Sequence, residues 1–339
     1  MTIQTLGLDI GKSTFHAVGL DARGQPVHRH KYTRSSLMKY MANLPPCLVG
    51  MESCPGSQYL ARRFSECGHT VRLMAAQFVK PYVKSNKSDY LDAEAIAEAV
   101  TRPTMRFVSV KTSAQQDLQA VHRVRSGLMT QRTAQINQLR AFLLENGLTI
   151  PCGVAALGQG VPRILEDAEN GLSPRMRALV AELWQQIHVL ETRIGELNEE
   201  LAHVARTDPA CQRLLTIPGV GRLTATALVA AIGNGQEFRH GRELAAFLGL
   251  VPQQYSTGGK PTLLGISKRG NTYLRMLFIH GARAVLRGAD KRADRLGPWL
   301  RGLKTRRHAN VAAVALANKL ARIAWAVLVQ GTEYRPTAA

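Results

Sequence analysis

Four carboxylates in the first 100 residues have the residue types and the surroundings of a metal site. Asp9 lies inside the apolar segment 6–10, and Glu52 directly follows a second apolar segment, 48–51. A charged side chain among apolar neighbours is costly unless it is paired or binds a cation. Carboxylate oxygens are the ligands that Mg²⁺ prefers, and Mg²⁺ keeps further positions for water and phosphate. We therefore expect a magnesium site that includes both residues.

Asp89 and Asp92 complete the predicted set. They are spaced i, i+3 at the start of a predicted helix over 89–100, for which Ser88 is the expected N-cap, so they share one helix face. The strand, strand, helix order of the four residues is typical of an RNase H-like nuclease domain. Such sites use one or two ions to activate the attacking oxygen and stabilise the leaving oxygen of a phosphodiester. Taken singly, Asp89 and Asp92 could instead complement the helix dipole, and Glu52 could be a surface charge.

The elements that must position these carboxylates are predicted from local patterns. Apolar and small or polar residues alternate over 5–10 and 15–20, and Asp21–Gly24 reads as a turn, which predicts the start of a hairpin. Further short buried strands are expected at 47–51 and 70–75, with a helix at 57–67 between them. We therefore predict an α/β domain over residues 1–110.

A helical region is predicted over 111–206. A long helix is expected at 114–146, and a Gly- and Pro-punctuated connector at 149–173. From 176 to 204 apolar residues recur in steps of four and three, which predicts a coiled coil. This helix could pack within its own domain or against a second copy of the chain. Residues 207–339 are predicted to form a mainly helical C-terminal domain.

The charge balance points to a polyanionic partner. The chain has 44 Lys and Arg against 24 Asp and Glu, a net charge of +20. From Lys260 to Arg322 the acidic residues are Asp290 and Asp294 only, while Lys and Arg recur throughout. A surface with this bias is typical of proteins that bind nucleic acid, although a solvated basic surface without a partner has the same composition.

Cysteine usage and hydropathy favour a cytoplasmic protein. The five cysteines are dispersed without a Cys-x-x-Cys pair, which predicts reduced thiols and neither a zinc site nor a disulfide framework. We expect no membrane-spanning segment and find no signal-like N-terminus. The cysteines are Cys47, Cys54, Cys67, Cys152 and Cys211.

Two glycine-containing motifs could bind phosphate groups. Residues 217–221 read Ile-Pro-Gly-Val-Gly between apolar helical segments, the pattern of a helix–hairpin–helix in which Gly219 and Gly221 expose backbone N–H groups to a phosphate. An ordinary tight turn has the same pattern. Residues 7–13 are one residue short of a P-loop and also resemble the first phosphate loop of actin-like sugar kinases, but no second Asp-x-Gly follows.

A polar segment near the C-terminus carries two adjacent hydroxyls. Residues 252–260 are predicted to form a Gly-rich loop that contains Ser256 and Thr257. A hydroxyl beside cations could attack a phosphodiester, whereas a plain turn would leave both hydroxyls solvated. The loop is followed by a basic helix, predicted over 272–287. The cations expected to contact nucleic acid here are Lys260, Lys268, Arg269 and Arg275.

These motifs together resemble the DEDD transposases of insertion sequences. The shared motifs lie in the same order along nearly the whole chain, at 8–12, 51–53, 87–93, 217–221 and 255–271. The resemblance implies a RuvC-like RNase H-fold N-terminal domain, a coiled coil and a C-terminal transposase domain. It also implies a structured non-coding RNA that guides the enzyme to donor and target DNA.

By position, Asp9, Glu52, Asp89 and Asp92 match the family's metal-binding tetrad. The family also uses a serine that attacks DNA, and some members read Tyr-x-Ser-Gly there. This chain reads Tyr-Ser-Thr-Gly at 255–258, so gapless alignment puts Thr257 on the nucleophile position. We favour Ser256, because a primary hydroxyl is less hindered at phosphorus, and keep Thr257 as the alternative.

The sequence thus predicts a magnesium-dependent, RNA-guided recombinase of an insertion sequence that acts as a homo-oligomer, a dimer or a tetramer. Two other hypotheses stay open. A RuvC-like structure-specific endonuclease would need the tetrad but neither a nucleophilic hydroxyl nor a guide. A non-enzymatic DNA-binding scaffold would use the basic helices alone.

Overall fold

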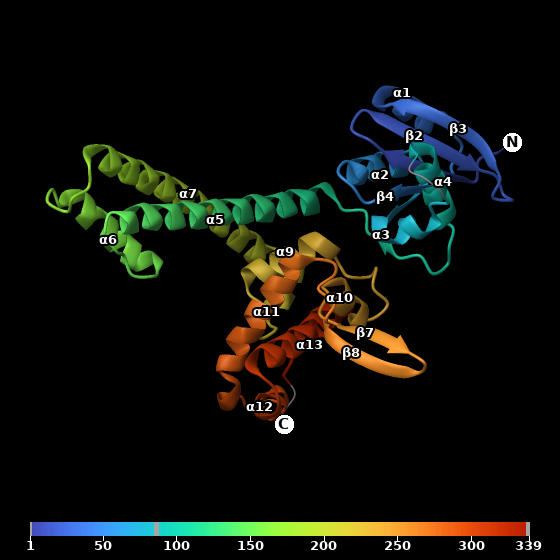
Figure 1. Cartoon of the computed structure of the whole chain (residues 1–339). Helices are drawn as coiled ribbons and strands as arrows, with labels where there is room; N and C mark the ends of the chain where they lie inside the picture. Colours follow the sequence, from blue (N-terminus) through green and yellow to red (C-terminus); the bar gives the residue numbers. More distant parts are fainter. Residues whose placement is uncertain (1, 85–87, 337–339) are drawn as a thin grey trace. The chain divides into compact units, whose positions relative to one another are not determined.

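A computed structural model describes residues 2–84 and 88–336. Lys87, the first residue of the motif at 87–93, lies outside these ranges. The chain divides into two compact units, residues 1–112 and residues 113–339. The first unit contains a β-sheet with helices packed on it, and the second is mainly helical, as Figure 1 shows. This mixed composition confirms the predicted α/β N-terminal and helical C-terminal fold classes, and it is consistent with an RNase H-like transposase.

The first unit contains a six-stranded sheet of order β3-β2-β1-β4-β5-β6. Strands β1, β2 and β3 form an antiparallel meander, β4 and β5 run parallel to β1, and β6 is antiparallel to β5. The chain crosses over twice, from β3 to β4 and from β4 to β5, through a helix each time. The strands are β1 Thr5–Ile10, β2 Thr14–Leu20, β3 Pro26–Thr33, β4 Leu48–Glu52, β5 Thr70–Met74 and β6 Phe107–Val108.

The alternation along β1 sorts its side chains onto two faces. Leu6 and Leu8 are buried in a core with helices α1 (Arg34–Asn43) and α2 (Ser57–Glu66). Gly7 and Asp9 lie on the opposite face, because side chains two residues apart in a strand share a face. That face is covered by helix α4 (Asp89–Ala99), followed in the chain by β6 and preceded by α3 (Ala76–Val79) and the short η1 (Lys80–Tyr82).

Helix α4 lies unusually close to the sheet at two glycines. Gly7 of β1 and Gly50 of β4 are direct partners in the parallel ladder. A Cβ atom on Gly7 would lie 2.1 Å from the Ala93 carbonyl oxygen, and one on Gly50 would lie 2.9 Å from the Cβ of Val100. The first distance is far inside van der Waals contact, so only glycine permits this packing. The approach brings the N-terminus of α4 over the ends of β1 and β4.

Strand β3 and helix α1 have no counterpart in the predicted elements. Five of the eight β3 residues are exposed, because β3 is an edge strand, and the segment therefore lacks an apolar alternation. Helix α1 begins with a capping box in which Thr33 and Ser36 exchange side-chain and backbone hydrogen bonds. Neither an exposed edge strand nor a capping box shows the regular spacing of apolar residues from which strands and helices are predicted.

The second unit begins with two long antiparallel helices, α5 (Ser113–Glu145) and α7 (Pro174–Thr207). Cross-pairs such as Gln135 with Gln186 and Arg125 with Asn198 show the antiparallel order. The predicted apolar positions lie along α7 and several of them are buried, so within one chain α7 packs on α5.

The segment predicted as a connector at 149–173 contains a helix, which corrects that prediction. Helix α6 (Val154–Glu166) buries Leu157 and Val161 against Leu139 of α5 and Val180 of α7. Its Gly and Pro residues suggested a loop, but apolar side chains at helical spacing gain more by packing across the tip of the α5–α7 pair.

The helices that follow α7 form one hydrophobic core, which packs against the N-terminal part of α5. His122 of α5 is buried and lies 3.0 Å from the Thr226 hydroxyl and 3.1 Å from the Tyr273 hydroxyl, which ties α5 to α9 and α11. Burial lowers the pKa of His122 to about 4, so this link is made by a neutral ring. The elements are α8 Pro209–Leu215, α9 Arg222–Ile232, α10 Gly241–Phe247, β7 Pro252–Thr257, β8 Lys260–Ile266, α11 Thr272–Arg287, η2 Ala289–Lys291, α12 Leu296–Arg306 and α13 Ala309–Gln330.

Helix α13 is long and apolar enough to cross a membrane by length and composition, and it is the one such helix in the described part of the chain. Half of its apolar window is buried inside the protein. Leu316, Leu320 and Ala324 pack in the helical core with α11 and α9. This central position accounts for its composition.

The glycine contact beneath α4 gives a first prediction. Gly7→Ala is expected to lower the free energy of unfolding by about 1–3 kcal/mol, because the added methyl group must push α4 away from β1. The same displacement should weaken Mn²⁺ binding by roughly tenfold, since it moves Asp89 and Asp92. Chemical denaturation and Mn²⁺ titration measure the two effects.

The control is Gly127→Ala on α5, where an added Cβ would meet nothing within 4 Å. This change should leave stability equal or slightly higher, as expected for alanine in a helix. Wild-type stability and Mn²⁺ affinity in Gly7→Ala would contradict the close packing argued above.

Candidate functional site

The four predicted carboxylates lie near one another at the carboxyl ends of β1 and β4, two central strands of the sheet. Leu8 of β1 pairs with Met51 of β4, so the next residue in each strand, Asp9 and Glu52, lie beside each other. Helix α4 adds Asp89 and Asp92 from its first turn. The structure therefore brings together residues that are up to 83 positions apart in the sequence, 92 − 9 = 83.

Burial and mutual repulsion dominate the electrostatics of Asp9 and Glu52. Burial raises the pKa of Asp9, the negative charges of Asp89 and Asp92 raise it further, and His16 opposes this rise. Burial likewise raises the pKa of Glu52, with added repulsion from Asp9 and Asp92. A divalent cation would relieve both the desolvation and the repulsion, so the donor set fits a hard metal ion.

His16 is a residue of this site that the sequence analysis missed. It is Asp9's partner across the β1–β2 ladder, and its Nδ1 lies 3.5 Å from an Asp89 carboxylate oxygen. One ligand atom each from Asp9, His16 and Asp89 lie within 4.8 Å of one another. His16 shares one face of β2 with Val18 and Leu20, which pack against α4. This two-residue spacing is visible in the sequence, and it could have identified His16 as a residue on the same face of the sheet as Asp9.

Aromatic and cation–π contacts of Tyr90 position the first turn of α4, which carries Asp89, on the sheet. The Tyr90 ring meets the His16 ring edge-on at 4.8 Å, and the Arg29 guanidinium lies 4.6 Å from the centre of the Tyr90 ring. Ser88 occupies the N-cap position as predicted, but its side chain makes no capping hydrogen bond. The start of α4 is thus fixed by contacts to β2 and β3.

Ser256 and Thr257 lie on a β-hairpin, which corrects the prediction of a Gly-rich loop. They are the last residues of β7, and Thr257 pairs with Lys260 at the start of β8. Gly258 and Gly259 both have positive φ and make the two-residue turn that hairpins favour. Tyr255 and Thr257, an aromatic and a β-branched residue two positions apart, favour a strand here.

The two hydroxyls differ in their surroundings. Both residues are exposed, and as successive strand residues they point to opposite faces of the hairpin. Gln254, which shares a face with Ser256, places its side-chain nitrogen 2.8 Å from the Ser256 hydroxyl oxygen. Ser256 therefore has a neighbour that can orient it. Lys260, also predicted as a nucleic-acid contact, is exposed.

Arg275 is placed differently from its predicted role. It is buried, and its guanidinium donates to the Leu248 carbonyl at 3.0 Å, the Arg269 carbonyl at 2.8 Å and the Thr272 hydroxyl at 3.1 Å. These contacts fix the segment that leads into α11 and leave Arg275 buried away from phosphates. Lys268 and Arg269, by contrast, are exposed.

The two glycines of the predicted helix–hairpin–helix also differ. Gly219 has φ of +82°, and a Cβ there would lie 2.7 Å from the Gly281 carbonyl oxygen of α11. Its lack of a side chain therefore serves helix packing. Gly221 is exposed at the N-cap of α9 and meets no neighbour in this way.

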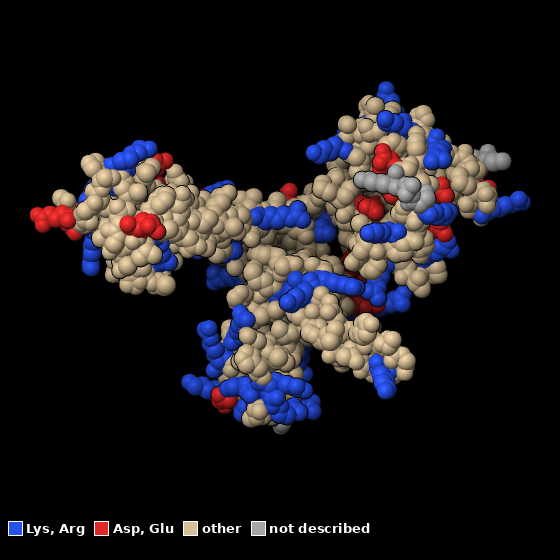
Figure 2. Space-filling view, in the orientation of Figure 1, with Lys and Arg blue, Asp and Glu red and all other residues tan. Residues whose placement is uncertain are grey.

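Positive charge gathers on the helical unit. Figure 2 shows the end of this unit around α12 covered mostly by Lys and Arg on the face in view, whereas Asp and Glu appear among the basic residues of the sheet unit. The basic side chains of this stretch include Lys291, Arg295, Arg301, Lys304, Arg306 and Arg307. This distribution matches the bias predicted for residues 260–322.

Comparison with known proteins identifies the family. A family model described as transposase of the IS116/IS110/IS902 family matches residues 211–296, and an IS110-type DEDD transposase model matches residues 6–146. The chain belongs to this family of transposases. The first match contains the β7–β8 hairpin, and the second contains all four carboxylates. The predicted resemblance is confirmed, and the protein is an enzyme that cleaves and recombines DNA.

The relatives match nearly the whole chain. It is 45% identical over 334 residues to the transposase for insertion sequence element IS1328 of Yersinia enterocolitica, with 98% of both chains covered. A probable family 20 transposase of Pseudomonas aeruginosa is 48% identical, with 99% of this chain and 100% of the relative covered. The transposase for IS1111A of Coxiella burnetii is 45% identical, with 98% and 92% covered.

The electrostatics of Asp9 give a second prediction. Asp9→Asn is expected to stabilise the metal-free protein at neutral pH, because it removes a charge that burial and repulsion from Asp89 and Asp92 disfavour. The difference from wild type should shrink as pH falls through the raised pKa of Asp9, where the wild-type carboxylate becomes neutral. Thermal unfolding at several pH values measures this.

Added Mg²⁺ or Mn²⁺ should reverse the order, since it stabilises the wild type and not Asp9→Asn. Asp117→Asn, which removes an exposed carboxylate from α5, is the control and should respond to the metal as wild type does. Equal metal stabilisation of the Asp9→Asn variant would show that Asp9 is not a ligand.

Proposed function

We propose that this transposase holds Mg²⁺ with Asp9, Glu52, Asp89 and Asp92 and is guided to donor and target DNA by a structured RNA of its own element. One observation supports the metal site above all: the four carboxylates lie close enough to repel one another, and Asp9 and Glu52 are partly buried. An unpaired carboxylate is costly to bury, so the group favours a bound cation. When bound, Mg²⁺ supplies Lewis-acid activation of a DNA phosphate and neutralises charge on its oxygens.

The residues of the chain have separate tasks in this proposal. The carboxylates bind and orient, while Ser256 supplies the attacking oxygen. The Ser256 oxygen forms a bond to phosphorus as the phosphodiester bond to one strand end breaks, and the hydroxyl proton ends on the departing oxygen or in solvent. Attack by a strand-end hydroxyl on the serine ester then releases Ser256 and rejoins DNA, so no phosphodiester is lost to hydrolysis.

The surroundings of the hydroxyls support Ser256 ahead of Thr257. Ser256 has the less hindered oxygen and the Gln254 contact at 2.8 Å. Thr257 stays the alternative, because it occupies the nucleophile position in the gapless alignment and is equally exposed.

Three parts of the chain divide the work in this proposal. Residues 1–110 form the RuvC-like catalytic domain, residues 111–206 a coiled-coil region and residues 207–339 the transposase domain. The exposed cations, Lys260, Lys268 and Arg269, and the Gly221 backbone would contact nucleic-acid backbones. A second copy of the chain would assemble along the α5–α7 pair, so the active enzyme is a dimer or a tetramer that works in the cytoplasm.

The nucleophile gives a third prediction. With a DNA substrate that carries the element ends, wild-type protein is expected to form a covalent adduct that survives denaturation. Ser256→Ala should abolish the adduct and Thr257→Val should keep it, since only the true nucleophile is irreplaceable. Denaturing gel electrophoresis followed by mass spectrometry of the adduct peptide reads the result.

The complementary pattern would assign the nucleophile to Thr257. Cleavage without an adduct in any variant would instead favour a RuvC-like endonuclease in which water attacks. In both cases Asp9→Asn should stop cleavage, because that residue belongs to the metal site and not to the hairpin.

RNA guidance gives a fourth prediction. Protein purified from cells that carry the whole element should retain an element-derived structured RNA, and its removal should reduce recombination at least about a hundredfold, because sequence recognition would rest on base pairing. Sequencing of the bound RNA and add-back of that RNA measure both. Full recombination by RNA-free protein would contradict the guide.

A further inference from the structure

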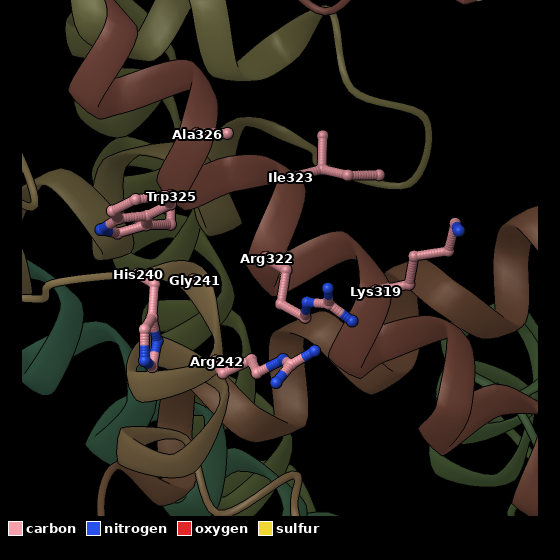
Figure 3. A pocket seen from close by; sticks show the side chains of 8 residues that line it. All are labelled: His240, Gly241, Arg242, Lys319, Arg322, Ile323, Trp325 and Ala326. Atoms are coloured by element: carbon pink, nitrogen blue, oxygen red, sulfur yellow. The ribbon is translucent and has the colours of Figure 1, made fainter.

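A groove between helices α10 and α13 gathers positive charge on the helical unit. It has a volume of about 500 Å³ and is open to solvent along one side. Figure 3 shows the guanidinium groups of Arg242 and Arg322 directed toward the same space, whereas Lys319, one turn before Arg322 in α13, points away from them. The remaining lining residues are His240, Gly241, Ile323, Trp325 and Ala326.

The approach of the two arginines is built into the backbone. Gly241 is the first residue of α10, and a Cβ there would lie 3.0 Å from both the Cα and the carbonyl oxygen of Arg322. The glycine therefore lets α10 start against α13. This packing brings Arg242, the next residue, beside Arg322.

The cations of the groove lack carboxylate partners. None of its lining residues is acidic. Within residues 2–84 and 88–336, no carboxylate oxygen lies within 4.0 Å of Arg242, Lys319 or Arg322. The Lys319 ammonium lies over the Trp299 ring, 5.0 Å from its centre. Two exposed guanidinium groups directed toward one space without a carboxylate partner produce a positive local potential that attracts an anion.

The other wall of the groove is apolar and rigid. It contains Ile323, Trp325 and Ala326. The Trp325 indole N–H donates to the carbonyls of Gly235 and Phe238, both at 3.2 Å, so the ring is fixed in place. Tryptophan beside arginine is the combination with which proteins bind unpaired bases and their phosphates.

We propose that this groove binds an unpaired nucleotide of a single-stranded nucleic acid, with its phosphate on Arg242 and Arg322 and its base against the apolar wall. The bases of a duplex are stacked inside the helix and cannot reach this wall, so a single strand is the better occupant. The inference rests on the proposed function only in that a polynucleotide is a ligand of the enzyme. A single strand of RNA and one of DNA share the chemistry, and the test separates them.

The test compares Arg242→Gln/Arg322→Gln with the wild type in fluorescence anisotropy titrations with EDTA present. The probes are labelled single strands of about twelve nucleotides, oligo(dT) and oligo(U), and a mixed-sequence duplex of equal length. For single strands we expect roughly tenfold weaker binding. The slope of log affinity against log salt should also fall by about 1.4, the value for two lost phosphate contacts.

The matched control, Arg63→Gln/Arg193→Gln, removes two exposed arginines that pair with glutamates three residues away. It should leave single-strand binding within about twofold of wild type. An equal loss in both double variants, or a loss for the duplex as large as for the single strands, would overturn the groove as a single-strand site. A stronger effect on oligo(U) than on oligo(dT) would identify RNA as the occupant, and the reverse would identify DNA.

Crosslinking gives a readout that does not depend on affinity. With oligo(4-thiouridine) or its DNA counterpart, a crosslink is expected on the peptide that contains Trp325, and it should be lost in the arginine variant but not in the control. Thermal unfolding of both variants checks that they fold. Because no metal or strand transfer is involved, a failure here leaves the proposed recombination untouched, and a failed recombination assay leaves the groove untouched.

Discussion

The candidate active site depends on how closely helix α4 can approach the sheet. Gly7 of β1 leaves room for Ala93 and Ala97, and Gly50, its direct neighbour in β4, leaves room for the side chains of Ile96 and Val100. With any larger residue the first turn of α4 would move outward, and the four carboxylates would no longer share one space. The glycines at the middle of the strands thus set the geometry at their ends, and the contacts of His16 and Tyr90 then fix the start of the helix.

The same packing makes the site unstable by itself. Burial and mutual repulsion raise the pKa values of Asp9 and Glu52, so the charged state at neutral pH costs free energy that the rest of the unit must offset. The buried sheet core, with Leu6, Leu8 and Phe64 fully excluded from solvent, can supply that free energy. A site that repels its own charges gains most from a cation, which is the property that a metal-dependent nuclease requires.

The parts of this site that were predicted are those that leave a local signal. An acid flanked by apolar residues marks Asp9, and i, i+3 spacing marks Asp89 and Asp92. His16 was missed because the predicted hairpin was not given a register, and the register is what pairs His16 with Asp9. Arg275 was misplaced because a buried arginine and an exposed one look alike in a sequence until their neighbours are known. Residues 252–260 of the hairpin were predicted as a loop because two adjacent glycines are typical of both a loop and a hairpin turn.

The division into two units bears on how the chemistry is organised. The carboxylates belong to residues 1–112, while the hairpin hydroxyls and the α10–α13 groove belong to residues 113–339. The proposed mechanism requires that the Ser256 hydroxyl of one unit and the metal site of the other act on the same phosphate. In the proposed enzyme the nucleic acid therefore completes the active site. Under this proposal the metal site alone would not cut DNA, because the chemistry requires that both units, from one chain or from two, hold the same strand.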